Sequence, residues 1–576
     1  MSLPTLILPR RGSALRNVSR FDPWTAFAFV AAALIALPIL VVLSYVFVPT
    51  QEIWRHLAAT VLPRYIWNSL ALAAGVGFCS LIIGVGTAWL VTMCRFPGRR
   101  LFEWALLLPM AMPAYVIAYT YTGLLDGGGP VQSFLREAFG WSFGDYWFPQ
   151  IRSLPGAIAM MALVLYPYVY LLSRAAFLEQ SVCVLEVGRT LGKGPWRCFF
   201  SVALPLARPA IVTGVALVLM ETLNDFGTVQ FFGVSTFTAG IYRTWLGMGE
   251  PAAAAQLAAI LTMFVFALIV LERVSRGPGR VHHTSTRYRQ LPRFQLHGQW
   301  AALAFLASFL PILLGFLVPA ALLFGWSIET GSRIIDERYL SYAINSFLLA
   351  SAAAILAVFV AMIMAYGLRM RRNRAMAAAT QIASMGYAVP GAVIAVGVLI
   401  PFAALDNWLD DWMRDQFGLS TGLLLSGTIV AVIFAYLVRF LAISFNTVES
   451  SLAKITPHMD DAARTLGSRP LATLLRIHLP ITWGSLLTAG ILVFVDVMKE
   501  LPATLLLRPF NFDTLAIRAY QLATDERLAD ASSPALAIVL VGIAPVVLLS
   551  LAIARSRPGS GETPVLEGFT AGSGDE

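Results

Sequence analysis

Residues 25–48 read TAFAFVAAALIALPILVVLSYVFV, an uninterrupted run without a charged side chain. An α-helix rises about 1.5 Å per residue, so this run is long enough to cross a hydrocarbon core about 30 Å thick. The basic segment before it, from Arg10 to Arg20, is not followed by a small-residue cleavage site. We therefore expect residues 25–48 to be a retained membrane anchor rather than a removed signal peptide.

Similar apolar runs recur along the whole chain of 576 residues. Hydrophobic residues make up 58% of the sequence and charged residues 13%, whereas soluble domains carry about 25% charged residues. These values exclude a water-soluble globule, a coiled coil, a collagen and a disordered chain. Alternation with a period of two is absent, so the runs predict helices rather than barrel strands. The predicted fold is all-α and polytopic, with twelve spans at 25–48, 67–93, 101–125, 154–177, 207–231, 252–272, 300–326, 341–368, 376–403, 421–446, 482–507 and 534–554.

The distribution of basic residues predicts the orientation of these spans. Of the 41 Lys and Arg residues, 28 lie in the N-terminus, in or within a few residues of the loops after even-numbered spans, and in the C-terminal tail. Cytoplasmic loops carry the excess of Lys and Arg in membrane proteins. Both termini are therefore expected in the cytoplasm. The same asymmetry explains the net charge of +9, so no nucleic-acid partner is expected.

A polar stretch between the sixth and seventh spans divides the chain into two halves. It contains Gly-Pro-Gly, a pair of histidines and several arginines. The expected organisation is an N-terminal cytoplasmic tail over 1–24, a first domain over 25–275, a cytoplasmic linker over 276–299, a second domain over 300–556 and a Gly- and Ser-rich disordered tail over 557–576.

Motifs of the first half recur in the second half at a nearly constant offset in residue number. Asn68-Ser69 recurs as Asn345-Ser346 and Pro113 as Pro390, both at an offset of 277. The long cytoplasmic loop after the fourth span recurs after the tenth at an offset of 275. In this loop Glu186, Gly192, Leu204 and Pro205 correspond to Asp461, Gly467, Leu479 and Pro480. The chain is predicted to be a tandem duplication with parallel copies, because six spans separate them.

This repeated loop resembles the E-A-A-x3-G-x9-I-x-L-P signature of the membrane subunits of binding-protein-dependent ABC importers. The second copy carries Ala462 and Ala463 and departs from the signature only at Asp461, where the family has Glu. The first copy departs further, with Val187 and Gly188 in place of the two alanines and Val202 in place of Ile. The resemblance implies two tandem six-helix permease domains of the type I ABC importer class, in a bacterial inner membrane.

The loop pattern itself predicts a helix, a tight turn at Gly192 or Gly467, and a second short helix that ends near Pro205 or Pro480. An ordinary amphipathic interfacial helix is the alternative. In the family, this element couples the permease to an ATP-hydrolysing subunit. The resemblance therefore implies two copies of an ABC ATPase and a periplasmic binding protein as partners, besides the lipid bilayer. It assigns the coupling role to Glu186, Gly192, Leu204, Pro205, Asp461, Ala462, Ala463, Gly467, Leu479 and Pro480.

The chain has no sequence signature of its own catalysis. No G-x4-G-K-[ST] motif occurs, and no cytoplasmic segment is long enough for a nucleotide-binding domain. No nucleophile–base pair or HExxH motif is present either. We expect a permease subunit that is not an enzyme and holds no cofactor, while a partner ATPase uses ATP and Mg²⁺. Metal ligands stay unassigned.

Ionisable residues within membrane spans are costly and point to function. The predicted spans five and eleven contain Glu221, Asp225, Asp496, Lys499 and Glu500. The offset of 275 relates Glu221 to Asp496 and Asp225 to Glu500, and a spacing of four places each pair on one helical face. These side chains either line the translocation pathway or form a structural network neutralised by Lys499 and helix ends. Arg439 is expected to pair with one of the acids, which the sequence does not identify.

Two further stretches of the sequence narrow the range of possible cargoes. Residues 224–245 and 499–528 resemble the ferric-iron importer permeases, whose membrane subunit also consists of two fused halves. A hard trivalent cation suits carboxylate oxygens, which is compatible with this assignment. Two alternatives stay open: a thiamine or aminoethylphosphonate ABC permease, and an ion-driven secondary transporter with twelve helices.

Overall fold

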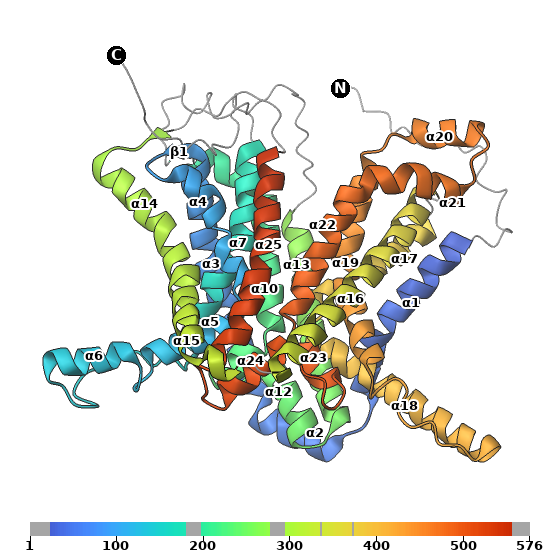
Figure 1. The fold of residues 1–576 in the computed structure, drawn as a ribbon, viewed down its shortest axis with the longest axis horizontal. Coiled ribbons are helices and arrows are strands. Elements are labelled where there is room, and N and C mark those ends of the chain that lie inside the picture. The colour runs from blue at the N-terminus through green and yellow to red at the C-terminus, as the bar shows by residue number, and fades with distance from the viewer. Residues whose placement is uncertain are drawn as a thin grey trace, which may run out of the picture.

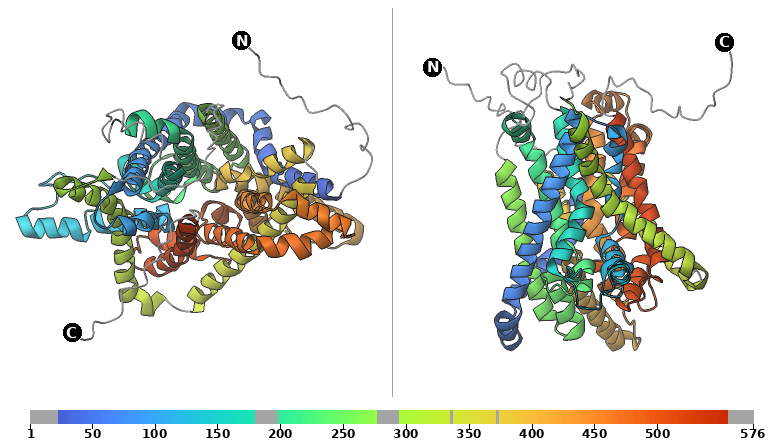
Figure 2. Two further views of the ribbon diagram at one scale, coloured as in Figure 1. Left: turned by 90° about the horizontal axis from the view of Figure 1, so that it is seen from above. Right: turned by 90° about the vertical axis from the view of Figure 1, so that its left-hand side faces the viewer.

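The computed structural model describes residues 23–179, 197, 199–276, 294–334, 337–370 and 374–555. These residues form a bundle of long helices, shown from three directions in Figures 1 and 2. The first half consists of α1 (Pro23–Ser44), η1 (Tyr45–Phe47), α2 (Gln51–Thr60), α3 (Leu62–Met93), β1 (Cys94–Arg95), α4 (Arg99–Ala105), η2 (Leu108–Ala111), α5 (Ala114–Leu125), α6 (Pro130–Phe139), α7 (Leu154–Glu179), η3 (Phe199–Ala203), α10 (Leu204–Asn224), α11 (Gly227–Phe231), α12 (Phe237–Tyr242), η4 (Arg243–Gly247) and α13 (Pro251–Arg276).

The described elements of the second half follow a broadly similar order. It consists of β2 (Phe294–Gln295), α14 (Gly298–Ile312), η5 (Leu313–Leu317), α15 (Val318–Ile334), α16 (Glu337–Met370), α17 (Arg374–Ala383), η6 (Gly386–Ala388), α18 (Gly391–Phe417), α19 (Ile429–Ala453), α20 (Pro457–Thr465), α21 (Pro470–Thr473), η7 (Leu474–His478), α22 (Leu479–Met498), α23 (Pro502–Leu507), α24 (Leu515–Thr524) and α25 (Ser532–Arg555). The strands β1 and β2 form a short parallel pair that joins the end of α3 to the start of the second half.

The prediction of an all-α polytopic fold is confirmed. Among the described residues, ten helices are long and apolar enough to cross a membrane. The number is eleven if the bent pair Arg99–Ala111 and Ala114–Phe139 counts as one span, and α25 adds a further apolar helix. This agrees with about twelve spans.

Two predicted spans are not single helices, because each is broken at a proline. Residues 101–125 do not form one helix: the chain bends by 90° between Arg99–Ala111 and Ala114–Phe139. Residues 376–403 are likewise divided between α17 and α18. Pro113 and Pro390 adopt extended backbone with ψ of 143° and 141°. Proline has no N–H and disfavours helix in the residue before it, so both repeats break at the same position.

Three other predicted spans have wrong boundaries. The spans predicted at 207–231 and 482–507 end at Asn224 and Met498, and short separate helices, α11 and α23, follow. The span predicted at 421–446 begins only at Ile429, because the residues before it fold back along α18. There, the Asp406 carboxylate accepts hydrogen bonds from the amides of Leu424, Leu425 and Ser426.

Each half places its first membrane helix against the other half. Helix α1 packs on α16, α17 and α18, and α14 and α15 pack on helices that include α3, α4 and α5 (Figures 1 and 2). Glycines permit the close approach at both contacts. A Cβ atom added at Gly397 would lie 2.3 Å from the Pro38 carbonyl oxygen, and one added at Gly315 would lie 2.7 Å from that of Leu163. The two halves therefore interlock along one continuous core.

Candidate functional site

A cavity of about 120 Å³ lies between the two halves of the bundle. Its walls come from α5, α7 and the end of α10 on one side and from η6, α19 and the end of α22 on the other. All five predicted pathway residues line it: Glu221, Asp225, Asp496, Lys499 and Glu500. The fold thus brings together side chains from the two copies of the repeat, which lie far apart in the sequence.

The charged residues of the second half form two ion pairs in this cavity. Arg439 Nη1 lies 2.7 Å from Glu500 Oε2, and the exposed fractions of the two side chains are 6% and 4%. Lys499 Nζ lies 2.9 Å from Asp496 Oδ1, and about a quarter of each of these side chains is exposed. The partner of Arg439, which the sequence left open, is therefore Glu500.

The first half contributes carboxylates without a matching cation. Glu221 accepts a hydrogen bond of 3.1 Å from the hydroxyl of Tyr387, which belongs to the second half. Asp225 accepts from the backbone amides of Thr228 and Val229, at 3.0 and 3.1 Å, and so caps the N-terminus of α11. Among the described residues, neither carboxylate has an ion-pair partner within 4 Å.

The prediction that each pair of carboxylates shares one helical face is wrong. Asp225 lies just beyond the end of α10 in extended backbone, and Glu500 follows the end of α22. Glu500 accepts from the Ala503 amide at 2.9 Å and so caps α23, as Asp225 caps α11. A helix N-terminus carries partial positive charge and attracts a carboxylate. Asp225 and Glu500 therefore each cap a short helix in their own repeat, whereas Glu221 lies within α10.

Sequence reasoning missed three polar residues of the cavity. The side-chain carbonyl of Asn224 accepts a hydrogen bond of 2.7 Å from the backbone amide of Gly391, which is the first residue of α18. This bond joins the two halves. Tyr387 is the donor to Glu221. The Tyr115 hydroxyl is buried and has no hydrogen-bond partner among the described residues. The repeat offset could have indicated Asn224, because it occupies the position of Lys499.

Further contacts between the halves lie beyond the cavity, where α12, α23 and α24 meet at the end of the bundle opposite α20 (Figure 1). The Tyr242 hydroxyl donates to the Pro502 carbonyl. Arg152 binds Glu526 through two hydrogen bonds of 2.7 and 2.8 Å. These bonds and the Arg152 charge hold the pKa of Glu526 below its ordinary value. The halves are therefore closed on each other at this end.

The second predicted coupling loop forms the expected helix and turn at the opposite end of the bundle. Helix α20 contains Asp461, Ala462 and Ala463, and Gly467 follows it with a φ of +77°. The Asp461 side chain is 64% exposed and Leu466, just before the turn, is 86% exposed. The protrusion therefore presents an acidic and apolar face without a covering element among the described residues.

The prediction that a helix ends near Pro480 is wrong. Helical structure runs from Pro470 through the π-turn η7 into α22, which begins with Leu479 and Pro480. Proline cannot donate the regular helical hydrogen bond, and the wider turn just before it accommodates this loss. The π-turn η3 precedes Leu204 and Pro205 in the same way. Glu186 and Gly192 of the first coupling loop lie outside the described residues.

Comparisons with known proteins identify the family. A family model described as binding-protein-dependent transport system inner membrane component matches residues 80–276. The Fe(3+)-transport system permease protein FbpB 2 of Haemophilus influenzae is 27% identical over 529 residues, which cover 90% of this chain and 96% of that protein. The molybdenum transport system permease protein ModB of the same organism is 30% identical over 164 residues, which cover 28% of this chain and 69% of that protein. The chain belongs to this inner-membrane transport family.

Membership makes the chain a multi-pass permease of the inner membrane that contains both permease halves. The family operates with a periplasmic binding protein and an ATPase. Within the described residues, no group of three or more His, Cys, Asp or Glu side chains could hold a metal ion. The permease thus places an acidic cavity between its halves and a protruding loop at one end, and α22 runs from one to the other.

Proposed function

We propose that this permease imports ferric iron, delivered by a periplasmic binding protein and driven by two copies of a separate ATPase. The observation that carries the proposal is the similarity to FbpB 2, which extends over nearly the full length of both chains. The putative ferric transport system permease protein FbpB 1 of Haemophilus influenzae is also similar, with 24% identity over 82% of this chain. Four carboxylates against two cations in the cavity suit a positively charged cargo.

Alternating access follows from the arrangement of the two halves. The ATPase subunits would bind the loops around Gly192 and Gly467, and both termini would lie with these loops in the cytoplasm. Closure of the ATPase pair would separate the halves at the opposite end. This movement requires two hydrogen bonds to break, the one that Asn224 accepts from the Gly391 amide and the one that Tyr242 donates to the Pro502 carbonyl. The functional domains would be residues 25–275 and 300–556, joined by the linker 276–299.

The pathway residues divide into two groups in this proposal. Glu500 and Asp496 are neutralised by Arg439 and Lys499, and Asp225 is engaged by helix α11. Within the described residues, Glu221 makes no ion pair and accepts a hydrogen bond from a neutral hydroxyl, while Arg439 and Lys499 act on it at longer range. We propose that Glu221 contacts the passing cation. The two ion pairs, Arg439 with Glu500 and Lys499 with Asp496, would hold the walls of the cavity in place.

Uptake of radiolabelled iron tests the cargo. A strain lacking this gene should lose binding-protein-dependent uptake of ferric iron and regain it with the wild-type gene. Unchanged iron uptake in the deletion strain would overturn the ferric assignment and make thiamine and aminoethylphosphonate the next cargoes to measure. Uptake that persists after loss of the partner ATPase would instead favour an ion-driven transporter.

Glu221→Gln should lower iron uptake about tenfold or more without lowering the thermal stability of the purified permease. The amide keeps an oxygen that can accept from Tyr387 but removes the negative charge. The matched control is Glu137→Gln, which removes an exposed carboxylate on α6 outside the cavity and should leave uptake unchanged. Full uptake by the Glu221 variant would exclude Glu221 as the cation contact.

A further inference from the structure

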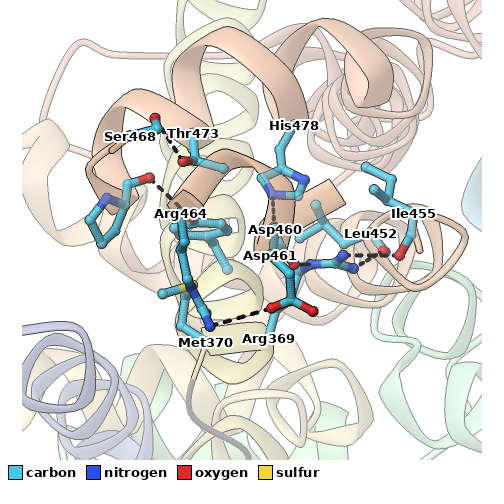
Figure 3. A network of polar contacts seen from close by, with 12 residues as sticks. Arg369, Met370, Leu452, Ile455, Asp460, Asp461, Arg464, Ser468, Thr473 and His478 are labelled. Atoms are coloured by element: carbon cyan, nitrogen blue, oxygen red, sulfur yellow. Dashed lines mark hydrogen bonds and ion pairs between the residues drawn. The ribbon is translucent and has the colours of Figure 1, made fainter. Parts of the chain in front are cut away.

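Three side chains from different elements meet beneath the second coupling loop. Figure 3 shows Arg369 from the end of α16, Asp460 from α20, and His478 from the residue just before α22. The Arg369 Nε atom lies 2.8 Å from Asp460 Oδ2, and His478 Nε2 lies 2.6 Å from Asp460 Oδ1. Both carboxylate oxygens of Asp460 are therefore occupied, each by a different membrane helix. We call these three residues the coupling joint.

Arg369 extends the coupling joint to a fourth element. Its Nη1 atom donates to the Leu452 carbonyl at 2.6 Å, and its Nη2 atom donates to the Ile455 carbonyl at 2.9 Å. These carbonyls belong to the last turn of α19 and to the connection that leads into α20. A guanidinium is planar and donates in fixed directions, so it fixes the orientation of the groups around it. Arg369 thereby holds both the start of α20 and the end of α19 against α16.

The coupling joint is buried, unlike the rest of the loop. The exposed fractions of the side chains are 0% for His478, 11% for Arg369 and 13% for Asp460. The neighbouring Asp461 is 64% exposed, and within the part of the chain that the structure describes it pairs only with Arg464 of the same helix, at 3.7 Å. Charged groups that are shielded from water interact more strongly and are costly to separate. Displacement of α20 relative to α16 and α22 therefore has to break buried, charge-assisted hydrogen bonds.

A second contact holds the other side of the loop to α16. The Tyr366 hydroxyl donates a hydrogen bond of 2.8 Å to the carbonyl of Pro470, which is the first residue of α21. The Tyr366 ring also lies 5.3 Å from the His478 ring. The buried Nδ1 of His478 has no hydrogen-bond partner among the described residues, which favours the tautomer with its proton on Nε2, the donor to Asp460. The loop is thus bonded to α16 before and after the Gly467 turn.

The two halves carry different residue types at the positions of the joint. At the offset of 275, Leu185 and Ala203 correspond to Asp460 and His478. The position that corresponds to Arg369 is Cys94 at this offset, or Thr92 at the offset of 277 found in that part of the repeat. None of these residue types supplies a guanidinium, a carboxylate or an imidazole. The three residues of the joint are therefore not repeated at the corresponding positions of the first copy, whose coupling loop lies outside the described residues.

We infer that the coupling joint makes α20 move as one body with α16 and α22, so that the second loop transmits most of the ATPase movement to the cavity. The inference rests on the proposed function, because it assumes that an ATPase binds this loop. Helix α22 leads from His478 at the loop to Asp496 and Lys499 in the cavity. A displacement at α20 therefore reaches the paired charges directly through one helix. Arg369, Asp460 and His478 are positioning residues in this scheme.

The test uses the complete transporter, with its ATPase and with ferric-loaded binding protein, in proteoliposomes. The number of iron ions imported per ATP hydrolysed should fall about tenfold in Asp460→Asn and in His478→Ala. A change of this size lies within the range of typical coupling between sites. His478→Gln should retain more coupling than His478→Ala, because its amide can donate close to the position of Nε2. Glu449→Gln, which changes an exposed carboxylate near the end of α19, should match the wild type.

Each outcome has a definite meaning. A wild-type ratio of iron to ATP in Asp460→Asn would overturn the inference. Loss of the ATPase from the purified Asp460→Asn complex would also overturn it, since the joint would then serve docking and not transmission. If wild-type transporter hydrolyses ATP without importing iron, the ferric proposal fails. The joint is then tested by the distance between spin labels at the exposed Leu466 and Phe510. ATP should change that distance in the wild type and change it much less in Asp460→Asn.

Discussion

Glu500→Ala should lower the free energy of unfolding of this permease by about 3–5 kcal/mol. The substitution removes the partner of Arg439, whose guanidinium is buried between the halves of the bundle. An unpaired buried charge keeps the full cost of leaving water, while its compensating attraction is lost. The loss also removes the cap of α23, which Glu500 provides through the Ala503 amide. Thermal and denaturant-induced unfolding of the purified permease measure the effect.

Two control variants separate the buried charge from other causes. Asp496→Ala removes a carboxylate of the same cavity, but its partner Lys499 is about a quarter exposed, so a smaller loss of about 1 kcal/mol is expected. Replacing both members of the buried pair, as Arg439→Met with Glu500→Leu, should restore much of the stability because neither charge is left buried without its partner. If Glu500→Ala and Asp496→Ala are equally destabilising, burial of the pair does not determine its contribution.

The sequence alone predicted the polytopic fold, the duplication and the coupling signature. Apolar runs such as 25–48 leave few alternatives, because lipid requires backbone hydrogen bonds within each span. The turn at Gly467 was predictable because a left-handed backbone favours glycine. These features depend on local composition and on the repeat, which one sequence displays directly. The assignment of pathway roles to Glu221 and its neighbours stays a prediction.

Features that depend on tertiary contacts were not predictable to the same degree. The partner of Arg439 could be any of several acids until α19 and α22 were placed side by side. Asp225 and Glu500 were expected within long helices, but each caps a new short helix. The helix breaks at Pro113 and Pro390 had a signal in the sequence, because the two prolines occupy corresponding positions of the repeat. The apolar residues around each proline nevertheless favoured the prediction of one continuous span.

The two halves of the chain carry different charged residues at corresponding positions. At the offset of 275, Arg439 corresponds to Val164 and Lys499 to Asn224, so both cations of the cavity come from the second half. The coupling joint follows the same pattern. A homodimeric permease would carry each charge twice, with both copies near the axis and repelling each other. In the fused chain, one half supplies the cations of the cavity, and the other supplies Glu221, which has no ion pair within 4 Å among the described residues.

Gly467→Pro should reduce iron uptake to the background of the deletion strain. Gly467 has a φ of +77°, whereas proline fixes φ near −65°, and its amide donates to the Arg464 carbonyl at 3.0 Å. Proline removes both the backbone conformation and this hydrogen bond, so the exposed face of α20 is no longer presented to the ATPase. Gly467→Ala should be milder: an added Cβ meets no atom within 4 Å, which leaves only the strain of a left-handed residue, about 1–2 kcal/mol.

Gly418→Pro provides the matched control at the opposite end of the bundle. Gly418 ends α18 with a φ of +67°, its amide donates to the Arg414 carbonyl at 3.0 Å, and an added Cβ meets no atom within 4 Å. The backbone damage is therefore the same, but no ATPase contact is proposed there, and uptake should be largely retained. Gly192→Pro should have an intermediate effect, because Val187 and Gly188 already depart from the coupling signature. Equal loss in Gly418→Pro and Gly467→Pro would mean that uptake responds to damage at any turn, and the coupling role of Gly467 would be rejected.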